Sequence, residues 1–173
     1  MKHSRPGRLR AHLMLALALA LPAAGPALAS KTPAPATLQG VVTQVLDGDT
    51  VRFSVPGQPA VEVQLAHIDA PEICQAWGAE ARRALSDLAL NKPATLRPTG
   101  RSGSSTVGLL TVEGSNISKR LVEEGHAWST RGRNGRGPLM KEERLAQALA
   151  RGLHSGGRAV MPADFRRSHG PCP

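Results

Sequence analysis

Three acidic residues, Asp49, Asp69 and Glu72, stand at the ends of two short segments in which apolar and polar residues alternate. Carboxylate and carbonyl oxygens are the ligands that hard cations such as Ca²⁺ prefer. Two acids at the ends of neighbouring strands, with a third on the following turn, can hold one ion between them. The types and spacing of these residues therefore indicate a candidate cation site.

The same residues also fit a simpler interpretation as turns. Asp47-Gly48-Asp49 is a common turn sequence, and Asp69-Ala70-Pro71-Glu72 can be a strand exit followed by the start of a helix. Each segment taken alone favours a turn. Their succession in one chain, joined by a single hairpin, favours the cation site.

The pattern of apolar residues predicts five short strands and three helices around these acids. In the strand before Asp69, Val61, Val63 and Leu65 share one face and polar residues alternate with them, which is typical of a half-buried strand. We expect strands at 38–46, 49–55, 60–66, 94–97 and 107–112, helices at 77–90, 116–124 and 139–151, and an irregular tail from 156. Five strands with a helix between the third and the fourth match an OB-type barrel, which at this point is one option among several small α+β folds.

The first 29 residues have the features of an export leader. Basic residues precede an apolar run at 11–21, and Ala27-Leu28-Ala29 fits an A-x-A cleavage site. The run is too short for a transmembrane anchor, which takes about 20 residues. We expect a signal peptide over 1–29, a linker over 30–37, one domain over 38–153 and a tail over 154–173. The protein is then periplasmic or secreted, with no membrane attachment in its mature form.

The charge of the chain suits a polyanionic partner. The formal net charge is +9, and four of these charges lie in the leader, which leaves +5 on the mature chain. A moderate basic excess agrees with nucleic-acid binding, although many exported proteins are basic without it. The chain has two Trp, two Phe and no Tyr, so it lacks the aromatic residues of an extended base-stacking platform.

The two cysteines, Cys74 and Cys172, are the only ones in the chain. In an exported protein such a pair favours a disulfide over a metal site, and two independent thiols are the alternative. A bridge would join the C-terminal tail to the segment just after Glu72.

Four motifs together resemble the thermonuclease (staphylococcal-nuclease-like) family. They are Val45-Leu46-Asp47-Gly48-Asp49-Thr50-Val51, Ile68-Asp69-Ala70-Pro71-Glu72, Gly78-Ala79-Glu80-Ala81 and Leu121-Val122-Glu123-Glu124-Gly125-His126-Ala127-Trp128. The resemblance runs in register from about residue 38 to 153. The segments around Cys74 and Cys172 are similar to the exported bacterial branch of the family, in which these two cysteines are paired.

The resemblance implies an OB-fold nuclease, a five-stranded barrel of α+β class with three helices, that hydrolyses phosphodiester bonds of DNA or RNA with one Ca²⁺ ion. It implies that Asp49 and Asp69 bind the ion through their carboxylates and Ala70 through its main-chain carbonyl. It also implies that Glu72 orients or deprotonates the attacking water, a role that suits a carboxylate. The expected protein is a monomer that acts on single-stranded nucleic acid.

The chain departs from the family where two arginines should grip the phosphate. The positions that correspond to them hold Gln64 and Ser105, and neither side chain offers a cationic, bidentate fork. Arg101 lies in the same loop as Ser105 and could turn towards the phosphate, or it could be an ordinary loop charge. Arg131, Arg133 and Arg136 could bind the nucleic-acid backbone farther away, or they could form a flexible basic loop.

Two hypotheses follow from these residues. In the first, the protein is an exported nuclease with reduced activity, which the set Asp49, Asp69 and Glu72 favours. In the second, it is a catalytically inactive module that binds nucleic acid or a small anion, which the missing arginines favour.

Overall fold

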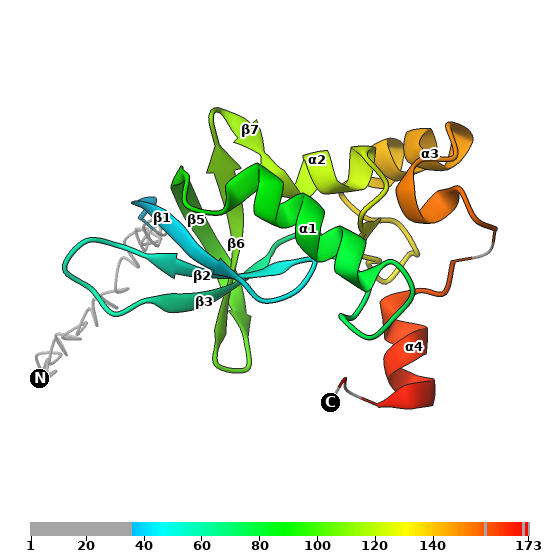
Figure 1. The fold of residues 1–173 in the computed structure, drawn as a ribbon, viewed down its shortest axis with the longest axis horizontal. Helices are drawn as coiled ribbons and strands as arrows, with labels where there is room; N and C mark the ends of the chain where they lie inside the picture. Colours follow the sequence, from blue (N-terminus) through cyan, green and yellow to red (C-terminus); the bar gives the residue numbers. More distant parts are fainter. Residues whose placement is uncertain (1–35, 158, 171, 173) are drawn as a thin grey trace, which may run out of the picture. The chain divides into compact units, whose positions relative to one another are not determined.

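Five strands close into a barrel in the computed structural model, which describes residues 36–157, 159–170 and 172. The first three strands form an antiparallel meander, the fifth pairs with the first and with the sixth, and parallel pairing of the third with the sixth closes the barrel (Figure 1). These strands are β1 (Leu38–Val45), β2 (Thr50–Ser54), β3 (Val61–Leu65), β5 (Pro93–Ser102) and β6 (Ser105–Val112). The predicted five-stranded OB-type barrel is confirmed.

The three predicted helices occur at their expected places in the chain, and short strands that were not predicted accompany them. The three predicted helices are α1 (Gly78–Ala89), α2 (Ile117–Glu123) and α3 (Met140–Ala148). The short elements are β4 (Ile68–Asp69), β7 (Ser115–Asn116), β8 (Trp128–Ser129) and the 3-10 helix η1 (Gly152–His154). The pairing of β4 with β8 places the strand that ends at Asp69 against the loop before α3.

The barrel strands direct alternate side chains into one apolar core. Phe53 of β2 and Val63 and Leu65 of β3 are fully buried there, together with Leu85 from α1. Because side chains alternate along a strand, Gln64 between two core residues faces away from the core. The acidic residues lie at the strand ends, so the core fixes the strands while the rim carries the carboxylates.

The C-terminal tail contains a fourth helix, α4 (Pro162–His169), where the sequence predicted irregular structure. Pro162 at its first position and Gly170, with φ 74°, just after its end are ordinary helix start and stop signals. The helix was missed because it has no apolar stripe: Pro162 is its buried residue and the others are largely exposed. The position of α4 depends on contacts with residues outside the helix.

The predicted leader, and the linker up to residue 35, lie outside the described residues. Within the part of the chain that the structure describes, no helix has the length and apolar character needed to cross a bilayer.

A hydrogen bond from Trp77 Nε1 to His126 Nδ1, at 3.2 Å, joins the start of α1 to the segment after α2. Burial lowers the pKa of His126 below its ordinary value, and Glu124 and Glu80 offset this only in part. The folded protein therefore disfavours the imidazolium, which also cannot accept the Trp77 bond.

We expect the stability contributed by neutral His126 to be present above pH 6.5 and to be lost as the pH falls below that value. The reason is that the unfolded chain, with a histidine pKa of about 6.5, then binds a proton that the folded chain resists. Urea unfolding at pH 7.5 and 5.5 should show a smaller loss of stability for His126→Gln than for the wild type. Equal losses would contradict this, and groups that titrate in both proteins cancel in the comparison.

Candidate active site

Asp49 is held at the rim of the barrel by the turn that precedes β2. Its main-chain N–H donates to Asp47 Oδ1 at 2.9 Å, and its carbonyl accepts from Leu65 N at 2.8 Å. Gly48 allows this turn to pack closely, because a Cβ there would lie 2.7 Å from the Cβ of Ala70. The turn that the sequence predicts at this point is real, and it positions a buried carboxylate.

The carboxyl group of Asp49 is only 7% exposed and accepts two hydrogen bonds. Oδ2 accepts from Ala70 N at 3.0 Å, and Oδ1 accepts from Thr50 Oγ1 at 2.9 Å. Burial raises its pKa to about 8, the charges of Asp47 and Asp69 raise it too, and the two hydrogen bonds offset part of the effect. The surroundings of Asp49 therefore disfavour its charged form, and a neighbouring cation would favour that form.

Asp69 and Glu72 lie on the next rim segment, at the end of β4 and in the turn that follows. The turn is fixed through Gln75, whose N–H donates to Glu72 O at 2.8 Å and whose Oε1 accepts from Glu72 N at 3.2 Å. Gly78 at the start of α1 packs directly on this turn, since a Cβ there would lie 2.0 Å from Glu72 O. The helix start therefore sets the position of the Glu72 carboxylate.

Arg166 of α4 bridges these two carboxylates. Its Nη1 lies 3.1 Å from Asp69 Oδ1 and 2.6 Å from Glu72 Oε1, and its Nη2 lies 3.1 Å from Asp69 Oδ2. The hydrogen bonds to Asp69 and then Glu72 raise the pKa of Arg166 above its ordinary value. The sequence analysis did not identify this residue.

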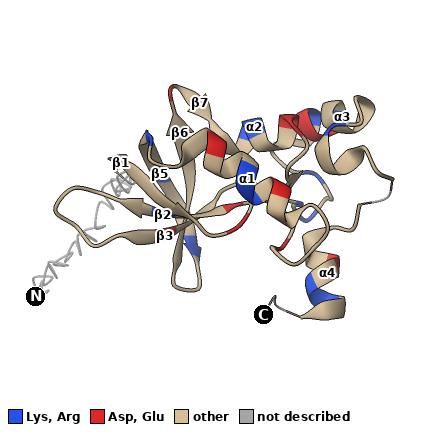
Figure 2. Cartoon of the chain, viewed as in Figure 1, with Lys and Arg blue, Asp and Glu red and all other residues tan. Residues whose placement is uncertain are grey.

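The predicted disulfide is present and explains how α4 reaches the rim. Cys74 and Cys172 are bonded, with their Cα atoms 5.7 Å apart, and Gln75 Nε2 donates to Val160 O at 2.7 Å. The sequence indicated that the tail returns to the segment after Glu72. A sequence signal that could have pointed to the ion pairs is the arginine six residues before the second cysteine. In Figure 2 acidic residues colour the loops beside α1, and α4 carries basic ones.

The donor atoms at the rim are of the type that a hard cation prefers. They are carboxylate and carbonyl oxygens, Asp49 has no cation within hydrogen-bonding distance among the described residues, and one guanidinium already lies between Asp69 and Glu72. In the same part of the chain no group of three or more acidic, His or Cys residues is spaced to hold a metal ion. Asp69 and Glu72 thus share a single positive charge, and Asp49 lies beside them as a separate buried carboxylate.

The two positions where the phosphate-gripping arginines were expected face outward from β3 and β6. Gln64 pairs with Thr50 in β2 and with Val107 in β6, while the Ser105 hydroxyl donates to Glu62 Oε1. Arg101 is exposed, and its Nη2 donates to Ser104 O at 3.0 Å within its own hairpin. Its contact with a phosphate stays a prediction.

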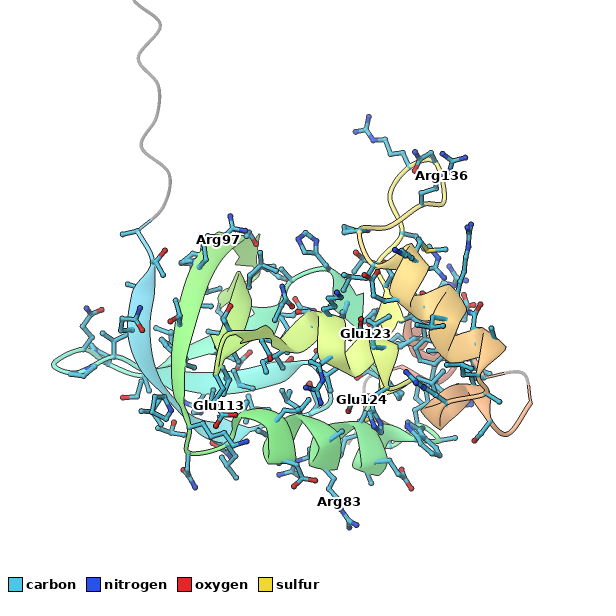
Figure 3. The ribbon with its side chains drawn as sticks, turned by 90° about the horizontal axis from the view of Figure 1, so that it is seen from above. Arg83, Arg97, Glu113, Glu123, Glu124 and Arg136 are labelled. Atoms are coloured by element: carbon cyan, nitrogen blue, oxygen red, sulfur yellow. A yellow bond between two sulfur atoms is a disulfide. The ribbon has the colours of Figure 1, made fainter. Side chains whose placement is uncertain are left out.

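Arg131 has a defined partner inside the protein. Its guanidinium donates to both carboxylate oxygens of Glu143, at 2.7 and 2.9 Å, and to Ser129 O at 2.7 Å. Arg133 and Arg136 are exposed, and Arg136 projects from the loop before α3 (Figure 3). The structure thus separates Arg131, which fixes the base of this loop, from the two exposed arginines, and nucleic-acid binding by the three stays a prediction.

Comparisons with known proteins identify the family. Residues 62–156 match the family described as Staphylococcal nuclease homologue. The chain is 34% identical to the Micrococcal nuclease of Shigella flexneri, over 87% of this chain and 93% of that protein. It is 34% identical to Protein ParB of Escherichia coli, over 91% and 93%, and 31% identical to an Uncharacterized endonuclease of Haemophilus influenzae, over 73% and 71%. The chain, with its OB-type barrel and its acidic rim, therefore belongs to the staphylococcal nuclease family and is a nuclease-like protein.

Proposed function

We propose that this protein hydrolyses phosphodiester bonds of single-stranded DNA or RNA in a Ca²⁺-dependent reaction, acting as a monomer. The observation that carries the proposal is the acidic rim, where the buried carboxyl of Asp49 has no positive partner among the described residues and Asp69 and Glu72 share one. Two relatives with nuclease or endonuclease in their names support the same reaction.

The residues that would hold Ca²⁺ are Asp49, Asp69 and the carbonyl of Ala70. When bound, the ion polarises a phosphoryl oxygen and offsets the charge that develops in the transition state. Glu72 is held by its turn at both its N–H and its carbonyl, and its carboxylate remains partly exposed. It can therefore receive a proton from an attacking water at a fixed position on the rim.

Turnover should be slow compared with a nuclease that grips the phosphate from the barrel. Arginines that meet a developing phosphoryl charge contribute about 10³–10⁵ in rate in other phosphoryl-transfer enzymes. Here position 64 holds an amide and position 105 a hydroxyl that is bonded to Glu62. The barrel surface beside the carboxylates therefore provides no guanidinium at these two positions.

The decisive experiment is cleavage of a labelled single-stranded DNA by the mature protein with Ca²⁺ and with EDTA. We expect cleavage only with Ca²⁺, and a fall of about 10²–10⁴ in rate for Glu72→Gln, which removes the base. Calorimetry should show Ca²⁺ binding that is lost in Asp49→Ala. Cleavage that is equal in EDTA, or unchanged in Glu72→Gln, would overturn the proposal.

A second candidate function has one observation in its favour. Arg166 occupies both Asp69 and Glu72, so the rim as it stands is neutralised by the protein itself. This suits a module that binds nucleic acid or a small anion without cleaving it. Binding of single-stranded DNA by a protein that shows no cleavage at any Ca²⁺ concentration would favour this function.

We also propose that the protein is exported, with cleavage of the leader before Ser30. The disulfide between Cys74 and Cys172 supports this, since such bonds persist in oxidising compartments. The check is the N-terminus of protein recovered from outside the cytoplasm, which should be Ser30. Recovery of that protein with Met1 still attached would contradict cleavage.

A further inference from the structure

The C-terminal helix places a guanidinium at the part of the rim where a substrate phosphate would be cleaved. Arg166 is the cation that forms ion pairs with Asp69 and Glu72 among the residues the structure describes. We infer that Arg166 is the residue that contacts the scissile phosphate in this protein, in place of an arginine from the barrel. This inference rests on the proposed function and names the phosphate-binding residue of the same site.

The hydrogen bonds of Arg166 leave one edge of its guanidinium available. Both N–H groups of Nη1 are directed to carboxylates, one to Asp69 and one to Glu72, and one N–H of Nη2 completes the bidentate pair with Asp69. A guanidinium has five N–H donors, so Nε and the second N–H of Nη2 have no partner among the residues that the structure describes. These two lie on the same edge and form a planar fork that matches two phosphate oxygens.

The Arg166 side chain is partly exposed and its orientation is set by the two carboxylates. It is 44% exposed, so a nucleic-acid strand can approach this side chain. The two carboxylates hold the opposite edge, which limits rotation of the guanidinium about its own axis. A donor fork fixed before the substrate arrives loses less conformational entropy on binding than a free surface arginine does.

The disulfide is the second part of this arrangement. Cys74 lies two residues after Glu72, and Cys172 lies six residues after Arg166, so the bond ties the turn of the acid to the helix of the arginine. Because Pro162 is the one fully buried residue of α4 in the described structure, the ion pairs, this bond and the Gln75–Val160 hydrogen bond help to hold Arg166 at the rim. The other arginine of α4, Arg167, is paired with Asp164 within the helix and provides a matched control.

The test compares Arg166→Gln with Arg167→Gln in the mature protein with its disulfide intact. We expect Arg166→Gln to lower kcat for single-stranded DNA by about a thousandfold. It should also weaken calorimetric binding of thymidine 3′-monophosphate, with Ca²⁺ present, by about tenfold or more. Arg167→Gln should change neither quantity more than about twofold, and circular dichroism and thermal unfolding should show that both variants fold.

Three further variants test where the guanidinium must lie. Replacing both cysteines by serine should lower kcat in the same direction as Arg166→Gln, and adding Arg166→Gln to that protein should have little further effect. Gln64→Arg introduced into Arg166→Gln should restore part of the lost rate, because it offers a guanidinium from the other side of the rim. Additive losses from the cysteine and arginine changes would contradict the placement of Arg166 by the disulfide.

The outcomes separate this inference from the proposed function. An Arg166→Gln variant that cleaves as fast as the wild type, or faster, overturns the inference and shows that Arg166 blocks the rim, while the nuclease activity stands. If the wild type does not cleave, the nucleotide-binding measurement decides: a loss of binding confined to Arg166→Gln supports the phosphate contact without catalysis, and unchanged binding overturns it.

Discussion

Introducing arginine at positions 64 and 105 together is expected to raise the rate of DNA cleavage by about a thousandfold over the wild type. The pairing of β3 with β6 brings the two positions to one outward face, with Gln64 opposite Val107 and Ser105 close enough to bond Glu62. That face adjoins the Asp49 turn, whose carbonyl accepts from Leu65 N–H. Two guanidinium groups on it can bind the charge that develops on one phosphate.

The gain in cleavage rate from the two arginines should be strongly non-additive. The neighbouring carboxylate of Glu62 should also affect the size of the gain. Each single change should give much less than the pair, because both arginines act on the same phosphate. Glu62 would attract an arginine at 105, since it already accepts from the hydroxyl there. Adding Glu62→Gln to the pair should therefore increase the gain.

The rate gain is measured by steady-state cleavage of single-stranded DNA. Two control proteins test whether added positive charge alone explains it. Gln39→Arg with Gln58→Arg adds the same two charges at exposed positions on β1 and on the hairpin between β2 and β3. Lysine at 64 and 105 adds charge without a bidentate fork. A similar gain in either control would show that general attraction of DNA, and not a phosphate grip, sets the rate. A folded double variant no faster than the wild type would contradict the prediction.

The barrel and the turn before Asp49 could be predicted because local sequence determines them. Alternation of apolar residues identified β2 and β3, and Asp47-Gly48-Asp49 forms the expected turn between β1 and β2. What the sequence could not supply is the burial of Asp49. That burial depends on Ala70 and Ala81, which are distant in the chain and pack around Gly48.

The contacts that the arginines make could not be predicted from the sequence. Arg166 and Asp69 are 97 residues apart, and nothing in the sequence of α4 indicates the ion pair. The disulfide was predicted, but the direction of a side chain in an exposed helix follows only from the tertiary structure. Charged residues that look alike in sequence, such as Arg131 and Arg133, differ in the fold because one of them has a buried partner.

Replacing Arg131 by methionine is expected to destabilise the protein by about 3 kcal/mol, near the lower end for a broken buried ion pair, because Arg131 itself is 30% exposed. Glu143 is 1% exposed and accepts from Arg131 twice, from Ser129 N at 2.9 Å and from Gln147 Nε2 at 3.0 Å. Without Arg131 its negative charge stays buried with only neutral donors. Urea unfolding of the mature protein measures the loss.

Adding Glu143→Gln to Arg131→Met should restore most of the stability. The amide removes the buried charge and keeps an oxygen that can accept from Ser129 N–H. Its new NH2 group can donate to the amide oxygen of Gln147 once that exposed side chain turns its amide over, so the buried donors keep partners. Equal stability of the single and double variants would contradict the ion-pair account.

The double variant also tests the predicted role of Arg131 in substrate binding, because it restores the fold without restoring the arginine. Nucleic-acid affinity that recovers along with stability would show that Arg131 acts by fixing the loop before α3, and affinity that stays low would show that it contacts the nucleic acid directly.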